Sequence, residues 1–305
     1  MHKSVLLNES IENLNLKDDY IVVDCTLGFG GHSKEILKRI KRGRLYAFDQ
    51  DIEAINYNEK NIKDKNIELI NTNFINLKKE LEKRNIKEVD AILFDLGVSS
   101  YQLDKTERGF SYNKDYKLDM RMNQNQKLSA YEVVNEYSEE NLTKILFEYS
   151  EEKYSRSISK NIVKYRNIKK IETTLELVEI IKKSVPMKYK LEKHPAKRTF
   201  QAIRIEVNNE LENLEKALED AIKVLGVNRR LCVITFHSLE DKITKKVFDK
   251  YSKEKSEFKN LPSIPEEYKP IAKVYKKIKP SIQELNDNPR SKSSTLRILE
   301  KTRKE

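Results

Sequence analysis

Short apolar runs alternate with helical periodicity over the first hundred residues of the chain. The runs are dominated by branched and aromatic side chains and lie at residues 21–23, 45–48, 67–70 and 89–94. Strands that are buried on both faces have this continuous apolar character. After the first run, Ile36, Leu37 and Ile40 recur at helical spacing. The alternation predicts an α/β fold, in which helices cover both faces of a parallel sheet.

The pattern changes after residue 101, where helical periodicity continues with almost no strand signal. Ser138 precedes two acidic residues and an apolar helical face, which predicts a helix N-cap. Thr173 or its neighbour Thr174 caps a further predicted helix, which stops before Pro186. We therefore predict that an all-helical insertion interrupts the α/β domain, with segments at residues 1–104, 105–191 and 192–305.

The sheet pattern resumes in the last third of the chain. Residues 205–225 predict one long amphipathic helix, which Gly226 ends. Residues 231–236 form another continuous apolar run, and residues 295–299 predict the last strand. The first and third segments, residues 1–104 and 192–305, are therefore predicted to form one discontinuous sheet domain.

A glycine-rich turn follows the first predicted strand. Asp24 ends that strand, and Gly28, Gly30 and Gly31 come directly after it. Glycines at this position let the backbone approach a ligand at the carboxyl edge of a sheet. The second strand ends in Asp49, where open α/β sheets place a carboxylate for ribose hydroxyls. The two strand ends together predict a nucleotide-cofactor site.

The spacing of the glycines favours one class of nucleotide cofactor. A dinucleotide fingerprint requires a third glycine where this chain has Ser33. The acid at position 24 suits a cofactor with a cationic amino-acid end and a ribose, without a pyrophosphate. The residues therefore favour S-adenosylmethionine over NAD.

The charge balance adds a weaker indication of nucleic acid. Lys and Arg total 60 against 49 Asp and Glu, a net charge of +11. A basic surface attracts phosphate polymers, although a chain rich in Lys, Asn and Ile also reflects an AT-rich coding sequence. Residues 188–204 predict a basic linker with interleaved aromatics, which suits phosphate contacts and base stacking but also an ordinary solvated face. Its candidate RNA-binding residues are Lys193, Lys197 and Arg198, and Arg290 lies in a second basic loop.

Cysteine and histidine usage predicts no disulfide framework and no metal site. Cys25 and Cys232 both lie in apolar runs, as buried thiols commonly do, and the 4 histidines are widely scattered. Residues 1–10 lack the apolar core of a signal peptide, and no apolar stretch approaches the length of a membrane span. We therefore expect a cytoplasmic protein without a membrane partner. The pattern does not indicate an oligomeric state.

Several longer strings together resemble one known family. They lie at residues 24–33, 95–104, 108–111, 118–122, 194–202, 236–241 and 288–290. In combination they are similar to the MraW family of bacterial small-subunit ribosomal RNA cytosine-N4 methyltransferases, from His2 nearly to the end of the chain. The resemblance implies a class I, Rossmann-like methyltransferase sheet interrupted by a helical domain. It also implies methyl transfer from S-adenosylmethionine to the N4 amine of a cytidine in the decoding centre.

The resemblance also implies which residues hold the cofactor. The expected set is Gly30, Gly31, His32, Asp49, Phe74, Asp95 and Gln102. In this set Asp49 binds the ribose, Phe74 lies beside adenine, and Asp95 and Gln102 lie near the methionine end. Without the resemblance, Phe74 would be interpreted as an ordinary core aromatic. The expected partner is the small ribosomal subunit or its RNA, with the helical insertion as a substrate-recognition domain.

The chemistry of the target restricts the candidate catalytic residues. A conjugated cytosine amine is poorly nucleophilic until an acceptor and an aligned methyl donor are in place, so positioning matters more than a covalent nucleophile. Many amino-methyltransferases use an Asn/Asp-Pro-Pro-aromatic turn for this step, whereas the turn here begins Asp95-Leu96-Gly97. Asp95 is a candidate acceptor or serves only the cofactor. His237 and Asp241 follow the next strand and are second candidates, with a structural hydrogen bond as the alternative role of His237.

Other functions compete with this interpretation. A methyltransferase acting on another RNA or DNA amino group has the same sequence requirements. A dehydrogenase requires NAD, against which the position-33 serine argues, and an RNA-binding module without activity needs no glycine loop. Cytosine C5 methylation normally requires a cysteine nucleophile, and neither Cys25 nor Cys232 is well placed for it.

Overall fold

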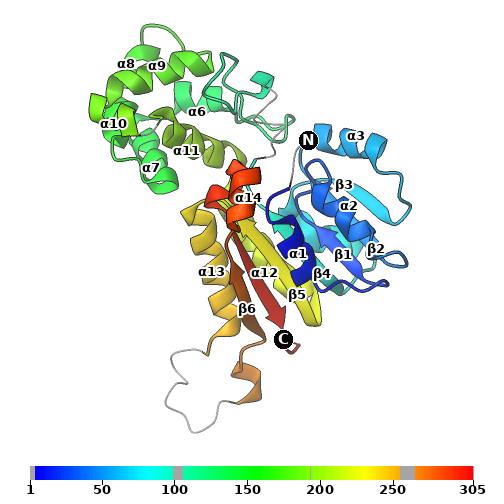
Figure 1. Cartoon of the computed structure of the whole chain (residues 1–305). Helices are drawn as coiled ribbons and strands as arrows, with labels where there is room; N and C mark the ends of the chain where they lie inside the picture. Colours follow the sequence, from blue (N-terminus) through cyan, green and yellow to red (C-terminus); the bar gives the residue numbers. More distant parts are fainter. Residues whose placement is uncertain (1–3, 99–105, 193, 255–264, 305) are drawn as a thin grey trace. The chain divides into compact units, whose positions relative to one another are not determined.

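The computed structural model describes residues 4–98, 106–192, 194–254 and 265–304 (Figure 1). The chain forms two compact units, one made of Met1–Gly97 with Leu211–Glu305 and the other of Val98–Glu210. The helical insertion therefore extends beyond the predicted residues 105–191 at both ends. Its carboxyl boundary is displaced because a helix that the sequence assigned to the sheet domain belongs to the core of the insertion.

Seven strands form one sheet in the first unit, in the order β3-β2-β1-β4-β5-β7-β6. Neighbours among β1 to β5 pair in parallel, whereas β7 runs antiparallel to both β5 and β6. The strands are β1 (Ile21–Asp24), β2 (Arg44–Asp49), β3 (Ile67–Asn71), β4 (Val89–Asp95), β5 (Leu225–Thr235), β6 (Ala272–Ile278) and β7 (Thr295–Lys301). The α/β architecture predicted from the sequence is confirmed, and β6 is an edge strand that the apolar pattern did not reveal.

The register of the strands aligns their ends across the sheet. Asp95 pairs with Ile234, which pairs with Leu296, which in turn pairs with Ile278. On the other side, the backbone N–H of Asp95 donates to Oγ1 of Thr26, just beyond β1. One row of residues therefore runs along the carboxyl edge of the parallel strands, where open α/β sheets bind their ligands.

Helices cover both faces of this sheet. One apolar core joins the sheet to α4 (Leu77–Lys83), α12 (Glu210–Val224) and α13 (Ser238–Ser252). The opposite core joins it to α1 (Leu7–Asn13), α2 (Gly31–Leu37) and α3 (Ile52–Asn61). Alternate residues of each strand enter alternate cores, as the period of a β-strand requires.

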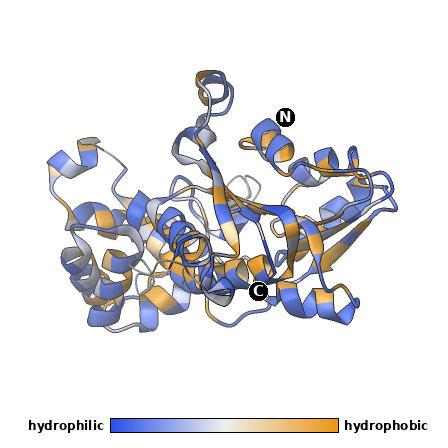
Figure 2. Cartoon of the chain, turned by 90° about the horizontal axis from the view of Figure 1, so that it is seen from below, coloured by the Kyte–Doolittle hydropathy of each residue, from blue (hydrophilic) through white to orange (hydrophobic). Residues whose placement is uncertain are grey.

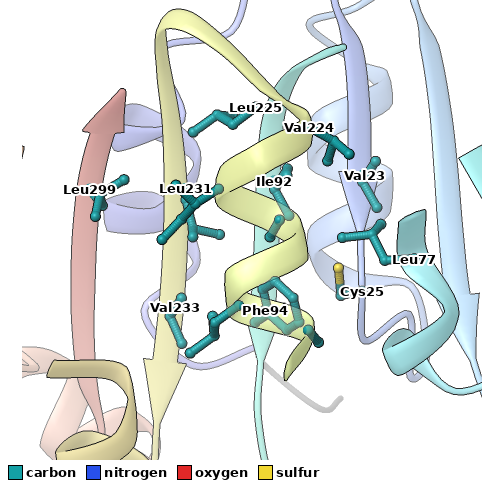
Figure 3. Close-up of a cluster of buried hydrophobic side chains, with 14 of the residues drawn as sticks. Val23, Cys25, Leu77, Ile92, Phe94, Val224, Leu225, Leu231, Val233 and Leu299 are labelled. Carbon is teal, nitrogen blue, oxygen red and sulfur yellow. The ribbon is translucent and has the colours of Figure 1, made fainter. Parts of the chain in front are cut away.

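Figure 3 shows the first of these cores, with α12 lying over side chains of β4 and β5. Ile92, Phe94 and Leu231 have no solvent exposure. Full burial of such side chains contributes about 1.5–3 kcal/mol each. The carboxyl ends of β4 and β5 are therefore fixed in place by packing, together with the polar residues that follow them.

The second unit is all-helical among its described residues. Its helices are α6 (Ala130–Glu136), α7 (Glu139–Ser150), α8 (Ser155–Arg166), α9 (Thr174–Ser184), α10 (Met187–Glu192) and α11 (Ala196–Asn208). Ser138 caps α7 by accepting from the N–H of Asn141, and Thr173 forms a capping box with Glu176 at α9. Both predicted caps are confirmed, with Thr173 rather than its neighbour at the second one.

Two predictions about residues 188–225 are wrong. The basic segment 188–204 is not a linker, because most of it lies in α10 and α11. The single helix predicted over 205–225 is two helices, since Asn209 takes a left-handed conformation (φ 48°) between α11 and α12. Phe200 and Ile203 of α11 are buried in the core of the helical unit, so α11 belongs to that unit. Amphipathic periodicity alone does not reveal such a break.

The helices of the described residues alternate hydrophilic and hydrophobic positions along their length (Figure 2). Within these residues, none of the helices is long and apolar enough to cross a membrane.

Candidate active site at the carboxyl edge of the sheet

Three acidic residues end the strands on the cofactor side of the sheet. Asp24, Asp49 and Asp95 are the last residues of β1, β2 and β4. Among the described residues, no Lys or Arg forms an ion pair with any of the three. The structure therefore gathers negative charge at this edge without a cation to balance it.

Asp24 organises the loop that follows β1. It has no solvent exposure, and its two carboxylate oxygens accept hydrogen bonds from Oγ of Ser33 (2.7 Å) and the N–H of Thr26 (3.1 Å). Burial raises the pKa of Asp24 to about 6. Ser33 thus replaces the third glycine of a dinucleotide loop with a hydroxyl that is used within the protein.

Asp49 also holds this loop while remaining partly exposed. Its oxygens accept from the N–H of Gly28 and from the N–H of Asp51, each at 2.9 Å. Burial raises the pKa of Asp49 to about 7, and the two backbone hydrogen bonds only partly offset this effect. A carboxylate has about four acceptor positions, so Asp49 retains capacity for ligand hydroxyls.

The glycines of the loop serve two different purposes. A Cβ on Gly28 would meet nothing closer than 4.0 Å, and this residue has φ +49°. A Cβ on Gly30 would lie 2.3 Å from Oδ1 of Asn58, and one on Gly31 would lie 1.9 Å from Oγ of Ser4. A side chain at Gly31 would thus force Ser4 to move, and one at Gly30 would force Asn58 to move and would also be strained by φ +74°.

His32 and Asp95 meet where α2 faces the end of β4. Nδ1 of His32 lies 3.5 Å from Oδ2 of Asp95. Burial lowers the pKa of His32 to about 4, so the imidazole is neutral at neutral pH. Burial, followed by the charges of Asp24 and Glu240, raises the pKa of Asp95 well above its ordinary value.

The other oxygen of Asp95 has acceptor capacity to spare. Its Oδ1 is buried and receives no hydrogen bond from the residues that the structure describes. A buried acceptor without a donor costs about 1–3 kcal/mol, so a ligand that donates here would gain affinity. Gln102, the expected neighbour of Asp95 at the methionine end, lies outside the described residues.

Phe74 lies beyond β3 at the same edge. It begins a short 3₁₀ turn that Asn73 caps, and its partly buried ring contacts that of Phe94 edge-on at 5.5 Å between centroids. The amide of Asn73 also donates to the side chain of Gln50, which follows Asp49. The turn is thus tied to the second strand end, and the ring of Phe74 remains partly exposed beside it.

His237 has a structural role at the end of β5. Its Nδ1 accepts from the N–H of Glu240 (3.5 Å) and caps α13, while Oε2 of Glu240 accepts from the N–H of Phe236 (2.7 Å). Nε2 of His237 lies 3.0 Å from Oε1 of Glu240. Nδ1 is therefore engaged as the cap, whereas the buried Nε2 makes no hydrogen bond with the described residues.

Asp241 is engaged as well. Both of its oxygens accept from the guanidinium of Arg297, at 2.7 and 2.8 Å. This ion pair lowers the pKa of Asp241. Any further hydrogen bond that Asp241 accepts from a substrate would therefore share the carboxylate with Arg297.

The candidate RNA-binding residues occur in both units. Lys197 is exposed on α11, whereas Arg198 donates to the backbone carbonyl of Glu151 and so stabilises the helical unit. Arg290 is exposed in the 3₁₀ turn η5 (Pro289–Ser293) of the sheet unit. Lys193 lies outside the described residues.

The sequence did not reveal several positioning residues. Asn58 of α3 donates to the carbonyls of Gly28 (2.7 Å) and Ala54 (2.8 Å), and Thr26 receives the N–H of Asp95. An asparagine inside a polar helix carries no local signal of such a contact. The capping box of Glu240 could have been recognised, since an acid three residues after a helix start is its usual pattern.

Comparison with known proteins identifies the family. The sequence matches the profile of the MraW methylase family over residues 1–302. The chain belongs to the MraW methylase family. Its sheet with a helical insertion is the class I, Rossmann-like methyltransferase fold that the resemblance implied.

Relatives of high identity carry one name. A ribosomal RNA small subunit methyltransferase H from Exiguobacterium sibiricum is 52% identical over 305 residues, 98% of each chain. A protein of the same name from Clostridium botulinum is 52% identical over 304 residues, again 98% of each. A solved rRNA methylase from Streptococcus thermophilus covers 99% of both chains with 14% identity and a TM-score of 0.44, which adds nothing to the sequence relationship.

Proposed function

We propose that this chain transfers the methyl group of S-adenosylmethionine to the exocyclic N4 of a cytidine in the decoding centre of small-subunit ribosomal RNA. The names of the MraW relatives support a ribosomal RNA target in the small subunit. The carboxyl-edge site supports the cofactor. The observation that carries the proposal is the buried Oδ1 of Asp95, which receives no hydrogen bond from the described residues and lies at one end of the row of strand-end acids.

The acidic residues fit a cationic cofactor. Asp24, Asp49 and Asp95 lie together with raised pKa values, which shows that the protein itself supplies little to stabilise their charges. Opposite charge within about 4–6 Å favours the ionised carboxylate, so a cationic ligand would bind here and lower these pKa values. When bound, S-adenosylmethionine supplies an electrophilic methyl group on a positively charged sulfur.

Each strand end has a distinct task in this proposal. Asp49 accepts the ribose hydroxyls while its backbone contacts keep the loop closed. Phe74 covers the adenine, and Asp95 faces the methionine end with Oδ1. Neutral His32 lies beside the other oxygen of Asp95, at 3.5 Å. These residues position the donor for an in-line displacement, which is the main requirement of the reaction.

The amine of the target must be held against the methyl donor. The new N–C bond forms as the C–S bond breaks, and the amine releases one proton. An acceptor that binds the N–H before the transfer raises the nucleophilicity of the amine. Asp95 is the candidate for this contact, because its buried Oδ1 is an acceptor that receives no hydrogen bond from the described residues.

The state of the two cysteines disfavours C5 methylation as the reaction. Burial raises the pKa of Cys25 well above its usual value and that of Cys232 to about 12, so neither forms a thiolate at neutral pH. A covalent attack on the cytosine ring needs that thiolate. The amino group is therefore the favoured target.

The decisive experiment is to incubate the protein with methyl-labelled S-adenosylmethionine and unmodified small subunits, or with the naked RNA. Mass spectrometry of the digested nucleosides then identifies the product. Label in N4-methylcytidine supports the proposal, and the better substrate shows whether the assembled subunit is required. Label in another nucleoside overturns the target, and absence of cofactor binding overturns the methyltransferase assignment.

A further inference from the structure

The carboxyl end of β6 lies on the same edge of the sheet as the cofactor site. The register places Ile278 in one row with Asp95, through Leu296 and Ile234. Three strand intervals of about 4.8 Å separate them, so the end of β6 lies roughly 15 Å from Asp95. Figure 1 shows the chain leaving this end of β6 toward α14 (Ile282–Asp287), away from the C-terminus.

Positive charge gathers at this end of the strand. Lys277 and Lys279 flank Ile278, and both lysines are exposed. Nζ of Lys279 donates to the backbone carbonyl of Ser294 and to Oγ1 of Thr295, which joins β6 to the start of β7.

The 3₁₀ turn η5 adds to the same cluster. It ends two residues before β7, whose first residue pairs with the last residue of β5 at the carboxyl edge. Its Arg290 and Lys292 are both exposed. The carboxyl end of β6 and η5 together form what we call the basic edge, made of Lys277, Lys279, Arg290 and Lys292.

The neighbouring carboxylate of Asp241 does not neutralise the basic edge. Lys277 and Lys279 both act electrostatically on Asp241, but this carboxylate is already bound on both oxygens by Arg297. The negative charge of Asp241 thus faces the positive charges of Arg297, Lys277 and Lys279. Lys273, nearer the other end of β6, is instead paired with Glu300 at 2.8 Å. Lys277, Lys279 and Lys292 form no ion pair with another described residue, so their uncompensated charge is concentrated at the ligand edge of the sheet.

Lysines on an edge strand also have a simpler purpose, since they prevent the edge from pairing with another chain. That purpose accounts for lysines along β6. It does not account for Arg290 and Lys292, which lie outside the strand and have no exposed edge to protect. A phosphate backbone complements both groups together.

We propose that the basic edge binds the phosphates of a single-stranded RNA segment next to the target nucleotide, on the β6 side of the cofactor site. This inference rests on the proposed function, because the RNA substrate is taken from it. At roughly 15 Å from Asp95, the contact falls within a few nucleotides of the base that is methylated. Phosphate contacts of this kind fix the register of an RNA strand without reading its sequence.

The test compares two double variants that change charge equally. K277E/K292E reverses the charge of two lysines of the basic edge. K65E/K87E reverses the charge of two exposed lysines that precede β3 and β4, where the parallel strands begin. Binding to unmodified small subunits is measured as a function of salt, cofactor binding by calorimetry, and folding by thermal melting. K277Q/K292Q removes the charge without introducing repulsion toward Asp241.

We expect K277E/K292E to weaken subunit binding at least tenfold near 0.1 M salt, and the logarithmic salt slope to fall by about one for each lysine lost. The glutamine variant should show the same change in slope with a smaller loss. Cofactor affinity and the methylation rate at saturating subunit should stay at the wild-type level. K65E/K87E should bind subunits nearly as wild type does.

Equal behaviour of the basic-edge variants and K65E/K87E would overturn the inference, while wild-type methylation of the RNA would leave the proposed function intact. A folded glutamine variant with wild-type subunit binding would also overturn it. If wild-type protein neither binds nor methylates small subunits, the inference and the proposed function fail together.

Discussion

Nδ1 of His32 lies 3.5 Å from Oδ2 of Asp95, so the first turn of α2 meets the end of β4 at an acid–imidazole pair. The pair is asymmetric. Burial keeps His32 neutral, and the buried Oδ1 of Asp95 receives no hydrogen bond from the described residues. The imidazole therefore lies against one oxygen of the carboxylate without supplying a charge that would neutralise it, and leaves the other oxygen for a ligand.

This asymmetry predicts the effect of D95N. Asparagine keeps the shape of the side chain but removes its charge, so a cationic cofactor should lose a charged hydrogen bond worth about 1.5–3 kcal/mol. Calorimetry should show roughly 10- to 150-fold weaker binding of S-adenosylmethionine. D64N, a substitution of an exposed acid in the loop before β3, is the control and should bind normally. Normal cofactor affinity with a reduced turnover number would instead assign Asp95 to the cytosine amine.

D49N tests the ribose contact. The substitution keeps one acceptor oxygen but places an NH₂ group against either the N–H of Gly28 or that of Asp51. We expect cofactor affinity to fall by about 1.5–3 kcal/mol, together with a smaller loss of thermal stability. If methyl transfer at limiting cofactor matched wild type, Asp49 would have no part in binding.

The raised pKa of Asp49 also predicts a pH dependence. Because its pKa is about 7 in the folded protein against an ordinary value of 3.8, the folded state binds the proton more tightly. This carboxyl therefore lowers the free energy of unfolding as pH rises from about 4 to 7, and Asp24 acts in the same direction up to about 6.

A cationic cofactor binds the ionised form, so its affinity should rise between pH 5.5 and 7.5 and then level off. His32 contributes no titration in this range, because its pKa is about 4. Calorimetry across the range should show the rise in wild type and a flatter profile in D49N. A pH-independent affinity in wild type would contradict the prediction.

The sequence was sufficient for the parts of the fold that depend on local pattern. Apolar runs located β1, β2 and β4, a shorter apolar segment located β3, and the serine and threonine caps located α7 and α9, because each signal lies within a few residues. β6 was missed because it is an edge strand: five of its seven residues are exposed, so it has no apolar run. The break at Asn209 was missed because both flanking helices continue one amphipathic pattern.

The same distinction applies to the site. Strand-end acids are visible in a sequence because each follows an apolar run. Asn58 and Thr26 act through contacts with segments distant in the chain, which no local pattern records. The reason for Gly30 and Gly31 was also hidden, since their close neighbours, Asn58 and Ser4, lie on other helices or near the amino end.

The cap at α13 predicts different results for two substitutions of His237. H237A removes the acceptor for the N–H of Glu240 and should cost about 1 kcal/mol of stability. H237N keeps a good N-cap acceptor and should restore most of that loss. If the histidine is only a cap, H237N should also retain methyl transfer. A stable but inactive H237N would identify His237 as a catalytic residue, with its pH–rate profile as the check.

Lys197 is the residue through which the helical unit can be tested for RNA contact. It is exposed on α11, whereas its neighbour Arg198 binds the backbone carbonyl of Glu151, so reversing Arg198 would disturb the unit itself. K197E should weaken subunit binding several-fold and reduce the salt slope by about one, without affecting cofactor affinity.

The matched control for this substitution is K160E, on the exposed side of α8 in the same unit. Both variants change the net charge of the helical unit equally, so a long-range electrostatic effect would appear in both. A loss of binding confined to K197E therefore requires a local contact between α11 and the RNA. Equal loss of binding in both variants would mean that the helical unit contributes to RNA binding only through its overall charge.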